Sequence, residues 1–537
     1  MEIREKTTAL IDALKNVCKS YGLGNDGNEY KIITQVFLYK FLNDKLGAAV
    51  KKLLPGERWE QSYSALPPEQ REQLLEKLPA DLPKLLPEQL IYSLLQRCGE
   101  ESFDLIFDDA MTAVAENNRK LFSTRTAAGT RIPLFERLCP FVTDQSRRAD
   151  FAAAVLGKLA DFSFEEAFDK SWDFFADIFE YLIKDYNTAG GGKYAEYYTP
   201  HAVAELMAGL LVSGFGGGIC ECYDPSAGTG TLLMALRHGL ERSGGECRIY
   251  AQDISQRSNK MLKLNLILNG LSGELDNAVQ GDTLLEPFHK SDDGTELRRF
   301  DFVVSNPPFK MDMSDVRERL AAMPERFWAG VPSIPAKKKE GMAVYACFIQ
   351  HVINSLKPRG RAAVVVPTGF LTAKGGVENA VLRHITDQRL VYGVVSMPPN
   401  LFATTGTNVS VLFLDNSRSS FGAALIDASG MGEEYRDSGF RRRRLRTFEA
   451  ERITAAFLGR KPEEDFCAVV GYDEIKAKNY SLSAGQYFGV VNSGEAYDPE
   501  LLAAETAESA ARLRALFAEG DRLQREIIER LDGLKFN

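Results

Sequence analysis

The sequence predicts an α/β fold, in which a doubly wound sheet follows an all-helical N-terminal domain and precedes a C-terminal helical extension. From about residue 215 onward, short apolar segments alternate with amphipathic segments of helical length. Residues 1–165 instead repeat apolar side chains at three- and four-residue spacing, and residues 499–534 form one long polar stretch with a narrow apolar stripe. We therefore expect three domains, at residues 1–165, 166–470 and 471–537.

The N-terminal region shows helical periodicity that prolines interrupt. The segments "TTALIDALKNVCKSY" (7–21) and "EYKIITQVFLYKFLNDKLG" (29–47) place apolar residues on one face and charge on the other. The prolines between residues 55 and 87 predict short helices. Because no nucleophile–base pair or metal-ligand spacing occurs here, we expect a packing role and no catalytic one.

The region after residue 215 alternates strands and helices, which predicts helices on both faces of the sheet. In such sheets, ligands bind beyond the carboxyl ends of the strands, and Asp224, Asp253 and Asn306 all fall at strand ends. The expected strands are 218–224, 247–253, 300–305, 360–367, 390–398 and 408–415, and the expected helices are 230–241, 255–270, 342–358 and 377–388.

Composition limits the classes of protein that the chain belongs to. With 537 residues and 45% hydrophobic content, it is long enough for several cores, and its formal net charge of −9 argues against unaided DNA binding. The eight cysteines show neither a disulfide framework nor a zinc-ligand spacing, which suits a reducing compartment, and we expect no metal. No signal peptide or membrane-length apolar run is present, so a soluble cytoplasmic protein is expected.

A glycine-rich turn, "YDPSAGTGTLL", joins the first strand of the sheet region to the following helix. Gly228 and Gly230 permit tight backbone geometry and close approach of a ligand beside a helix N-terminus. The nicotinamide fingerprint fails because Leu233 stands at its third glycine. A phosphate-binding loop near residue 190 fails because Asn187 and Tyr194 stand where glycine and serine or threonine are needed.

Two acids and a proline pair follow this turn. Asp253 closes the second strand and is placed to accept hydrogen bonds from ribose hydroxyls, and Asp282 of "GDTL" is placed to meet an adenine amino group. The strand "FDFVVS" then stops at "NPPF" (306–309), because two prolines offer no N–H to a neighbouring strand. Acids at strand ends are often merely solvated, but this order of elements indicates an adenosine-containing cofactor.

This order resembles the S-adenosylmethionine-dependent amino methyltransferases. The segment "KYAEYYTPHAVAELM" (193–207) is similar to the one that opens the catalytic domain of modification subunits of type I restriction-modification systems, which are N6-adenine DNA methyltransferases. The segments "GTNVSVLFLD" (406–415) and "NYSLSAGQYFG" (479–489) extend the resemblance through most of the chain. It implies a class I methyltransferase fold, with residues 166–470 as the catalytic domain and S-adenosylmethionine as cofactor.

The resemblance also implies which residues contact the cofactor. Asp253 stands where the family commonly has glutamate, and His201 stands where arginine is frequent. The implied contacts are Glu196, Tyr197, Tyr198, Thr199, Pro200 and His201 ahead of the sheet, Ser226, Ala227 and Gly228 in the turn, and Asp253. The positions of Asp224, Gly230 and Asp282 at strand ends and in the turn make them further candidates for cofactor contact.

The catalytic residues implied are Asn306, Pro307, Pro308 and Phe309. The lone pair of adenine N6 is delocalised into the ring, which makes it a poor nucleophile. If Asn306 Oδ1 and the Pro307 carbonyl each accept one N6–H, the nitrogen is drawn toward tetrahedral geometry and attacks the sulfonium methyl in line. The base must be flipped from the duplex, and Phe309 offers a stacking face that contributes about 1–3 kcal/mol.

Several alternatives remain open at this stage. The same tetrapeptide occurs in methyltransferases acting on RNA bases and on glutamine side chains, and a catalytically idle scaffold in a defence complex is a third possibility. The family resemblance implies double-stranded DNA and a separate specificity subunit as partners, with two modification subunits per specificity subunit, and leaves an endonuclease subunit open. The basic runs Lys337–Lys339 and Arg441–Arg444 are candidate DNA contacts, although charge runs are more often solvated faces. The apolar stripe expected to dock on the partner comprises Leu502, Leu513, Leu516, Leu523, Ile527, Leu531 and Leu534.

Overall fold

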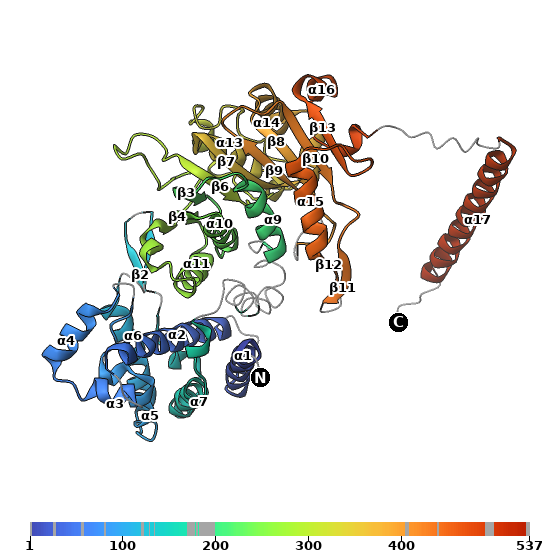
Figure 1. Ribbon diagram of the computed structural model, residues 1–537. Helices are drawn as coiled ribbons and strands as arrows, with labels where there is room; N and C mark the ends of the chain where they lie inside the picture. The colour runs from blue at the N-terminus through green and yellow to red at the C-terminus, as the bar shows by residue number, and fades with distance from the viewer. Residues whose placement is uncertain are drawn as a thin grey trace. The chain divides into compact units, whose positions relative to one another are not determined.

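The computed structural model divides the chain into two compact units, residues 1–487 and 488–537 (Figure 1). The domain limits expected from the sequence, after residues 165 and 470, stay predictions. The structure describes residues 3–24, 28–54, 58–79, 82–119, 123–127, 129–133, 135–168, 178, 181, 199–402, 408–437, 440–488 and 499–532.

The N-terminal region is helical, as its periodicity predicts. Phe37 and Phe41 of the second helix pack edge-on against the ring of Phe164, with centroids 5.0 and 5.4 Å apart. Short helices also form between the prolines, where they were expected. The helices are α1 (Ile3–Ser20), α2 (Glu29–Leu53), α3 (Trp59–Ser64), α4 (Pro68–Lys77), α5 (Ile91–Leu95), α6 (Phe103–Asn117) and α7 (Arg148–Ala160).

This region also contributes a hairpin that the sequence analysis missed. Strand β1 (Ser123–Thr126) pairs with β2 (Arg131–Pro133) and, in parallel, with β5 (Ala278–Gln280) of the sheet region. Strands this short cannot display the alternation by which a strand is detected. The buried Lys263 secures the junction, because its Nζ donates a hydrogen bond to the Ser123 carbonyl at 2.6 Å.

One large mixed sheet forms the centre of this unit, in the order β13-β10-β8-β9-β7-β6-β3-β4-β5-β1-β2. The pairs β3–β4, β3–β6, β6–β7 and β8–β10 are parallel, whereas β9 and β13 run antiparallel to their neighbours. All six predicted strands are confirmed, with small shifts at their ends. The strands are β3 (Gly218–Asp224), β4 (Gly245–Asp253), β6 (Phe300–Ser305), β7 (Leu356–Pro367), β8 (Val391–Ser396), β9 (Val409–Asp415), β10 (Gly422–Asp427) and β13 (Cys467–Gly471).

Helices cover the sheet in two groups, as the alternation predicts. One group comprises α9 (His201–Leu211), α10 (Thr231–Arg242) and α15 (Thr447–Gly459), in which α9 packs against the other two. The other comprises α13 (Tyr345–Asn354), α14 (Gly376–Asp387) and α16 (Tyr472–Ala477), in which α14 packs against its two companions. Two further helices are α11 (Gln256–Leu268), which lies along β4 and β5, and α12 (Arg317–Ala321).

The arginine run at residues 441–444 lies on a strand, although the sequence from 439 onward, "GFRRRRLRTFEAERITAAF", suggests a basic segment that leads directly into a helix. Strands β11 (Glu433–Asp437) and β12 (Phe440–Arg444) form a two-stranded sheet of their own, and α15 begins only at Thr447. The pairing of Glu433 with Arg444 and of Glu434 with Arg443 explains the strand, because acid–base neighbours stabilise an exposed ribbon. That pairing is not apparent from the run of arginines alone.

The second unit contains helix α17 (Pro499–Asp532), close to the predicted range of 499–534. Gly520 does not interrupt it. Among the residues that the structure describes, no helix is long and apolar enough to span a bilayer.

Lys263 generates a testable prediction about stability. Burial lowers the pKa of its ammonium group to about 7, whereas the unfolded chain keeps this proton up to about pH 10.4. Between these values the unfolded state binds more protons, so the free energy of unfolding should rise with pH by up to about 1.4 kcal/mol per unit. In thermal melts, the melting temperature of the wild type relative to that of Lys263→Met should increase as the pH rises. Parallel pH profiles for the two proteins would contradict the buried-lysine account.

Candidate active site

The glycine-rich turn connects β3 to α10 and has the backbone geometry that glycine alone adopts easily. Gly228 and Gly230 have φ values of +52° and +83°, in the left-handed region. A Cβ atom at Gly230 would lie 2.4 Å from Leu262 Cδ1 on α11, so any larger residue would require that leucine to shift and would adopt a strained backbone conformation as well. The turn therefore stays close to the neighbouring helix.

Asp253, at the end of β4, holds this turn in place. Its Oδ2 accepts the Gly228 N–H at 2.8 Å, and its Oδ1 accepts the Ser255 N–H at 2.8 Å. Burial raises the pKa of this carboxyl to about 6, although both backbone hydrogen bonds act in the opposite direction. A carboxylate has about four acceptor sites, so two remain for a ligand such as a pair of hydroxyls.

Asp224, at the end of β3, is also buried, with 1% of its surface exposed. Its Oδ1 accepts the Ser226 N–H at 2.9 Å, and the Ser226 hydroxyl lies 2.7 Å from the hydroxyl of Ser305 on β6. Burial, reinforced by the nearby charge of Asp253, raises the pKa of Asp224 to about 8. The ends of three neighbouring strands are thus joined by short polar contacts.

Asp282 lies in the loop after β5. Its Oδ1 accepts the N–H groups of Leu284 and Leu285 at 2.9 and 3.1 Å, which fixes the carboxylate on its loop. The Thr283 hydroxyl donates to the Pro225 carbonyl at 2.7 Å and so ties this loop to the glycine-rich turn. The buried guanidinium of Arg326 donates to the Thr283 and Leu284 carbonyls, a contact that the sequence analysis did not anticipate.

Asn306 follows β6 directly and is oriented by a partner from outside the sheet. Its Nδ2 donates to Thr199 Oγ1 at 3.0 Å, and Thr199 is buried. The carboxamide thus uses its donor group on the protein, and its oxygen remains as the acceptor. Pro307 is buried and Pro308 half-buried, whereas the Phe309 ring packs edge-on against Tyr345 with centroids 6.2 Å apart.

Asp224, Asp253 and Asp282 lie at two cavities that adjoin at Ser226 and Asn306. The first is polar and the second is largely apolar, with acids at its margin. The first is lined by Thr199, Asp224, Ser226, Ala227, Thr229, Thr231, Leu232 and Asn306, and the second by Pro225, Ser226, Asp253, Ile254, Asp282, Thr283, Leu284, Asn306, Pro308, Met311, Met313, Val344 and Phe348.

The structure brings most of the expected site residues together. Pro200 precedes α9 directly, and His201 Nδ1 lies 3.6 Å from the Glu205 carboxylate, one helical turn away. Phe309 lines neither of the two cavities. The roles of the expected site residues in binding a ligand stay predictions. Glu196, Tyr197 and Tyr198 lie outside the described residues.

Sequence analysis missed several apolar residues of the second cavity. Ile254 follows Asp253 and is 50% exposed, an unusual environment for isoleucine at the end of a buried strand. Its position directly after the acid at the end of a strand is the sequence feature that could have identified it as a cavity residue. Met311, Met313 and Phe348 come from the segment after Pro308 and from α13, and no local pattern connects them to β4.

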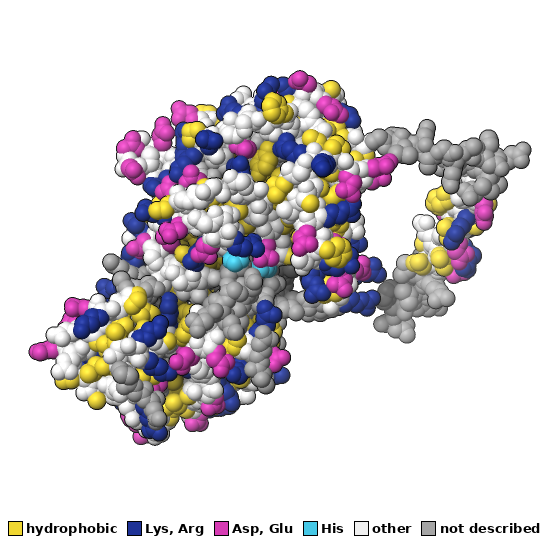
Figure 2. All heavy atoms as spheres, in the orientation of Figure 1, with side chains coloured by type: hydrophobic (Ala, Val, Ile, Leu, Met, Phe, Trp, Pro, Cys, Tyr) yellow, Lys and Arg dark blue, Asp and Glu magenta, His cyan; other side chains and the backbone are white. Residues whose placement is uncertain are grey.

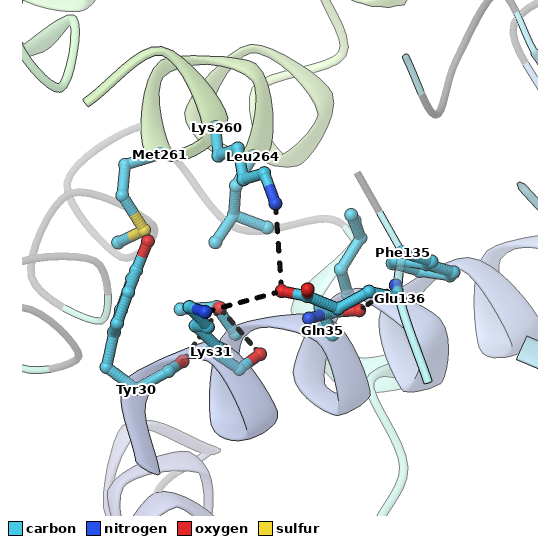
Figure 3. A pocket seen from close by; sticks show the side chains of 10 residues that line it. Tyr30, Lys31, Gln35, Phe135, Glu136, Lys260, Met261 and Leu264 are labelled. Atoms are coloured by element: carbon cyan, nitrogen blue, oxygen red, sulfur yellow. Dashed lines mark hydrogen bonds and ion pairs between the residues drawn. The ribbon is translucent and has the colours of Figure 1, made fainter. Parts of the chain in front are cut away.

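A further pocket lies between α2 and α11 and has a different character (Figure 3). Glu136 lies between two lysines there, with Oε1 3.9 Å from Lys31 Nζ and 3.8 Å from Lys260 Nζ. Its carboxylate is thus neutralised by cations from both sides, and the pocket contacts none of the residues at the ends of β3, β4 and β6. We interpret it as an ion-pair junction between the helical region and α11.

The sheet, the turn after β3 and the acids at the neighbouring strand ends have the arrangement of the class I methyltransferase fold. The sequence profile of the family described as N-6 DNA Methylase matches residues 170–496, more than half of the chain. The chain belongs to this family.

Curated relatives are similar in sequence, and a solved structure is similar in fold. The MjaIX type I restriction enzyme methylase subunit of Methanocaldococcus jannaschii is 28% identical over 393 residues, which cover 71% of this chain and 67% of the relative. The MpnII methylase subunit of Mycoplasma pneumoniae is 26% identical over 358 residues, 66% of this chain and 64% of the relative. This chain thus spans about two thirds of each relative's length. A type I methyltransferase subunit from Streptococcus thermophilus has a similar fold, with a TM-score of 0.72 at 22% identity, covering 90% of this chain and all of the other.

The raised pKa of Asp253 predicts how cofactor affinity depends on pH. Below about pH 6 the carboxyl is protonated and loses the charge that strengthens its hydrogen bonds to hydroxyl groups. Affinity for S-adenosylmethionine should therefore fall roughly tenfold between pH 7 and pH 5, with a midpoint near 6, as calorimetry would measure. In Asp253→Asn the affinity should be lower and should not vary across this range. A wild-type pH profile that the substitution leaves intact would refute this assignment.

Proposed function

We propose that this chain transfers a methyl group from S-adenosylmethionine to N6 of an adenine flipped out of duplex DNA, as the modification subunit of a type I restriction-modification complex. The observation that carries the proposal is the geometry of Asn306. Its carboxamide stands at the end of β6 with its nitrogen engaged by Thr199, beside the cavity that Asp253 and Asp282 line. Membership of the N-6 DNA Methylase family supports the choice of DNA adenine.

The two adjoining cavities fit S-adenosylmethionine, a ligand with one polar and one flat, largely apolar end. Asp224, Ser226 and the turn around Gly228 would hold the methionine end, in the polar cavity. Asp253 would accept the ribose hydroxyls, and Asp282 the adenine amino group, with Ile254 and Phe348 against the ring. The bound cofactor supplies an electrophilic methyl group on a sulfonium.

The residues after β6 would activate the acceptor nitrogen. Asn306 Oδ1 and the Pro307 carbonyl each accept one N6–H of the target adenine, which draws the nitrogen lone pair out of the ring. The preceding contact with Thr199 presets the amide orientation, so no reorganisation is needed at the moment of reaction. Pro308 lacks an N–H, so it cannot donate to a neighbouring strand at this point. Positioning and oriented dipoles thus perform the chain's part of the chemistry.

Phe309 would support the flipped base. Its ring is half-buried and rests edge-on against Tyr345, whose hydroxyl donates to Glu378 Oε1 at 2.6 Å. This anchoring limits the rotamers of Phe309 and prepares a face for stacking. An RNA base or a glutamine amide would be activated by the same two acceptors, so product analysis is the decisive measurement.

We expect Asn306→Ala to reduce methyl transfer to DNA by at least about a hundredfold, because an acceptor aimed at the reacting nitrogen is lost. Binding of S-adenosylmethionine should stay within a few-fold of wild type, because Asn306 is assigned to the target base. Transfer of labelled methyl groups and calorimetry measure the two quantities.

Phe309→Ala is the matched variant, and it should lose less activity, mainly through a weaker apparent affinity for DNA. Digestion of the methylated DNA to nucleosides identifies the product. Methyl groups found at cytosine N4, or transferred only to RNA or protein, would show that the substrate assignment is wrong.

A separate specificity subunit would supply sequence recognition, with helix α17 as part of its docking surface. Large apolar side chains are exposed along this helix, including Leu516 at 61% and Phe517 at 70%. Leu513, Leu523 and Ile527 are exposed as well, as the predicted stripe requires. Leu502, Leu531 and Leu534 belong to the same prediction, but their side chains lie outside those described. Exposed apolar stripes of this kind are typical of helices that pack against a partner.

The full complex proposed contains two modification subunits per specificity subunit and acts on double-stranded DNA in the cytoplasm. An endonuclease subunit is compatible with it but is not required for methylation.

We predict that the purified chain binds DNA weakly and without sequence preference, because the net charge of −9 offers little overall attraction to phosphates. Adding the specificity subunit should restore site-specific methylation, and deleting residues 499–537 should prevent the complex from forming in gel filtration. As control, the deletion variant should still bind S-adenosylmethionine. Site-specific methylation by the isolated chain would disprove the proposal that a separate subunit supplies sequence recognition.

A further inference from the structure

The β11–β12 ribbon, residues 433–444, is a concentrated source of positive charge on an acidic chain. It contains five arginines and three acids within twelve residues. Its two strands pair with each other and with no other strand that the structure describes. Figure 2 shows dark blue side chains gathered where Figure 1 draws this ribbon, with magenta ones among them.

The base of the ribbon is anchored firmly. The Gly432 N–H donates to the buried Glu449 carboxylate at 3.0 Å, and the Arg443 N–H donates to the Asn400 carbonyl at 3.1 Å. Arg443 Nη1 also donates to the Met431 carbonyl at 3.2 Å. Arg443 is therefore a structural residue, and the ribbon is held at a defined place on the protein.

Three other arginines are available on the ribbon. Arg441 and Arg444 are 71% and 70% exposed and have only exposed acids as partners, at 3.7 Å (Glu434) and 2.9 Å (Glu433). Exposed ion pairs of this kind are weak and exchange readily for a stronger anion. Arg436 is exposed and forms no ion pair with a residue that the structure describes.

The ribbon leaves the sheet at the same edge as the candidate active site. It follows β10, which runs parallel to β8 and in the same direction as β6, so the carboxyl ends of β10 and β6 lie at one edge. Four strand spacings separate β10 from β6 in the sheet order, a distance of roughly 19 Å.

Protection of an exposed strand edge would also explain charged residues on a ribbon. That role requires charge of either sign, and lysine serves it as well as arginine. A run of four guanidinium groups, at the edge where the acceptor is presented, instead suits bidentate contacts to phosphate oxygens.

We propose that the β11–β12 ribbon binds the sugar-phosphate backbone of duplex DNA beside the target adenine, through Arg436 and Arg441 on one face of the ribbon and Arg444 on the other. This inference rests on the proposed function and adds to it a contact that the chain makes without its partner. The contact positions the duplex and carries no sequence information.

The test compares two triple variants of the full-length chain with equal charge change. The ribbon variant carries Arg436→Gln, Arg441→Gln and Arg444→Gln. The control carries Arg248→Gln, Arg299→Gln and Arg359→Gln, three exposed arginines near the amino ends of strands, at the opposite edge of the sheet. Fluorescence anisotropy with a labelled duplex of about two helical turns measures affinity between about 50 and 200 mM salt.

The ribbon variant should bind about tenfold more weakly at low salt, and its plot of log affinity against log salt should be less steep by about 2.7, or about 0.9 per phosphate contact. The control should match the wild type. The triple exchange to lysine should keep the wild-type slope, and unchanged cofactor affinity verifies folding. If the triple variant fails to fold, Arg436→Gln alone should lower the slope by about 0.9.

A ribbon variant with the wild-type slope would overturn the proposal, as would one that loses only the complex with the specificity subunit. Methyl transfer by the wild-type complex is measured separately. Its absence would reject the proposed function, whereas an active complex with an unchanged slope would reject the ribbon alone.

Discussion

The hydrogen bonds of the Asp253 carboxylate are the interaction on which the site depends. One oxygen holds the Gly228 N–H of the turn after β3, and the other holds the Ser255 N–H after β4. This clamp sets the distance between two neighbouring strand ends and stabilises the left-handed glycine turn between β3 and α10. Without this contact, the glycine-rich turn and Asp253, which we assign to the same cofactor, would no longer be held at a fixed distance from each other.

Burying the Asp253 carboxylate costs desolvation free energy. Burial of Asp253 and Asp224 raises the pKa of both carboxyls, to about 6 and about 8, so the cavity holds less negative charge near neutral pH than two free acids would. Hydrogen bonds from backbone N–H groups compensate part of the desolvation. The pair thus provides acceptors in a cavity whose charge responds to pH.

The carboxamide of Asn306, which we propose as an acceptor for the target base, depends on a longer chain of contacts. Asn306 is oriented by Thr199 from the segment before α9, while Ser305 beside it contacts Ser226 in the turn. The loop of Asp282 is tied to the same turn through Thr283, and Arg326 fixes that loop from the other side. Residues from five separate segments therefore hold the two cavities and the Asn306 carboxamide in one arrangement.

The sequence by itself determined six strands of the large sheet, the order of the candidate site residues and the end of β6, because apolar alternation and the proline pair are local signals. Only the tertiary structure decided which atoms of Asp253 and Asn306 are engaged, that β1 joins β5, and that Ile254 and Phe348 share a cavity. It also placed Arg441–Arg444 on a strand that follows β10, at the edge of the sheet where the candidate site lies. These features arise from contacts between segments far apart in the chain, and no local pattern encodes the partner.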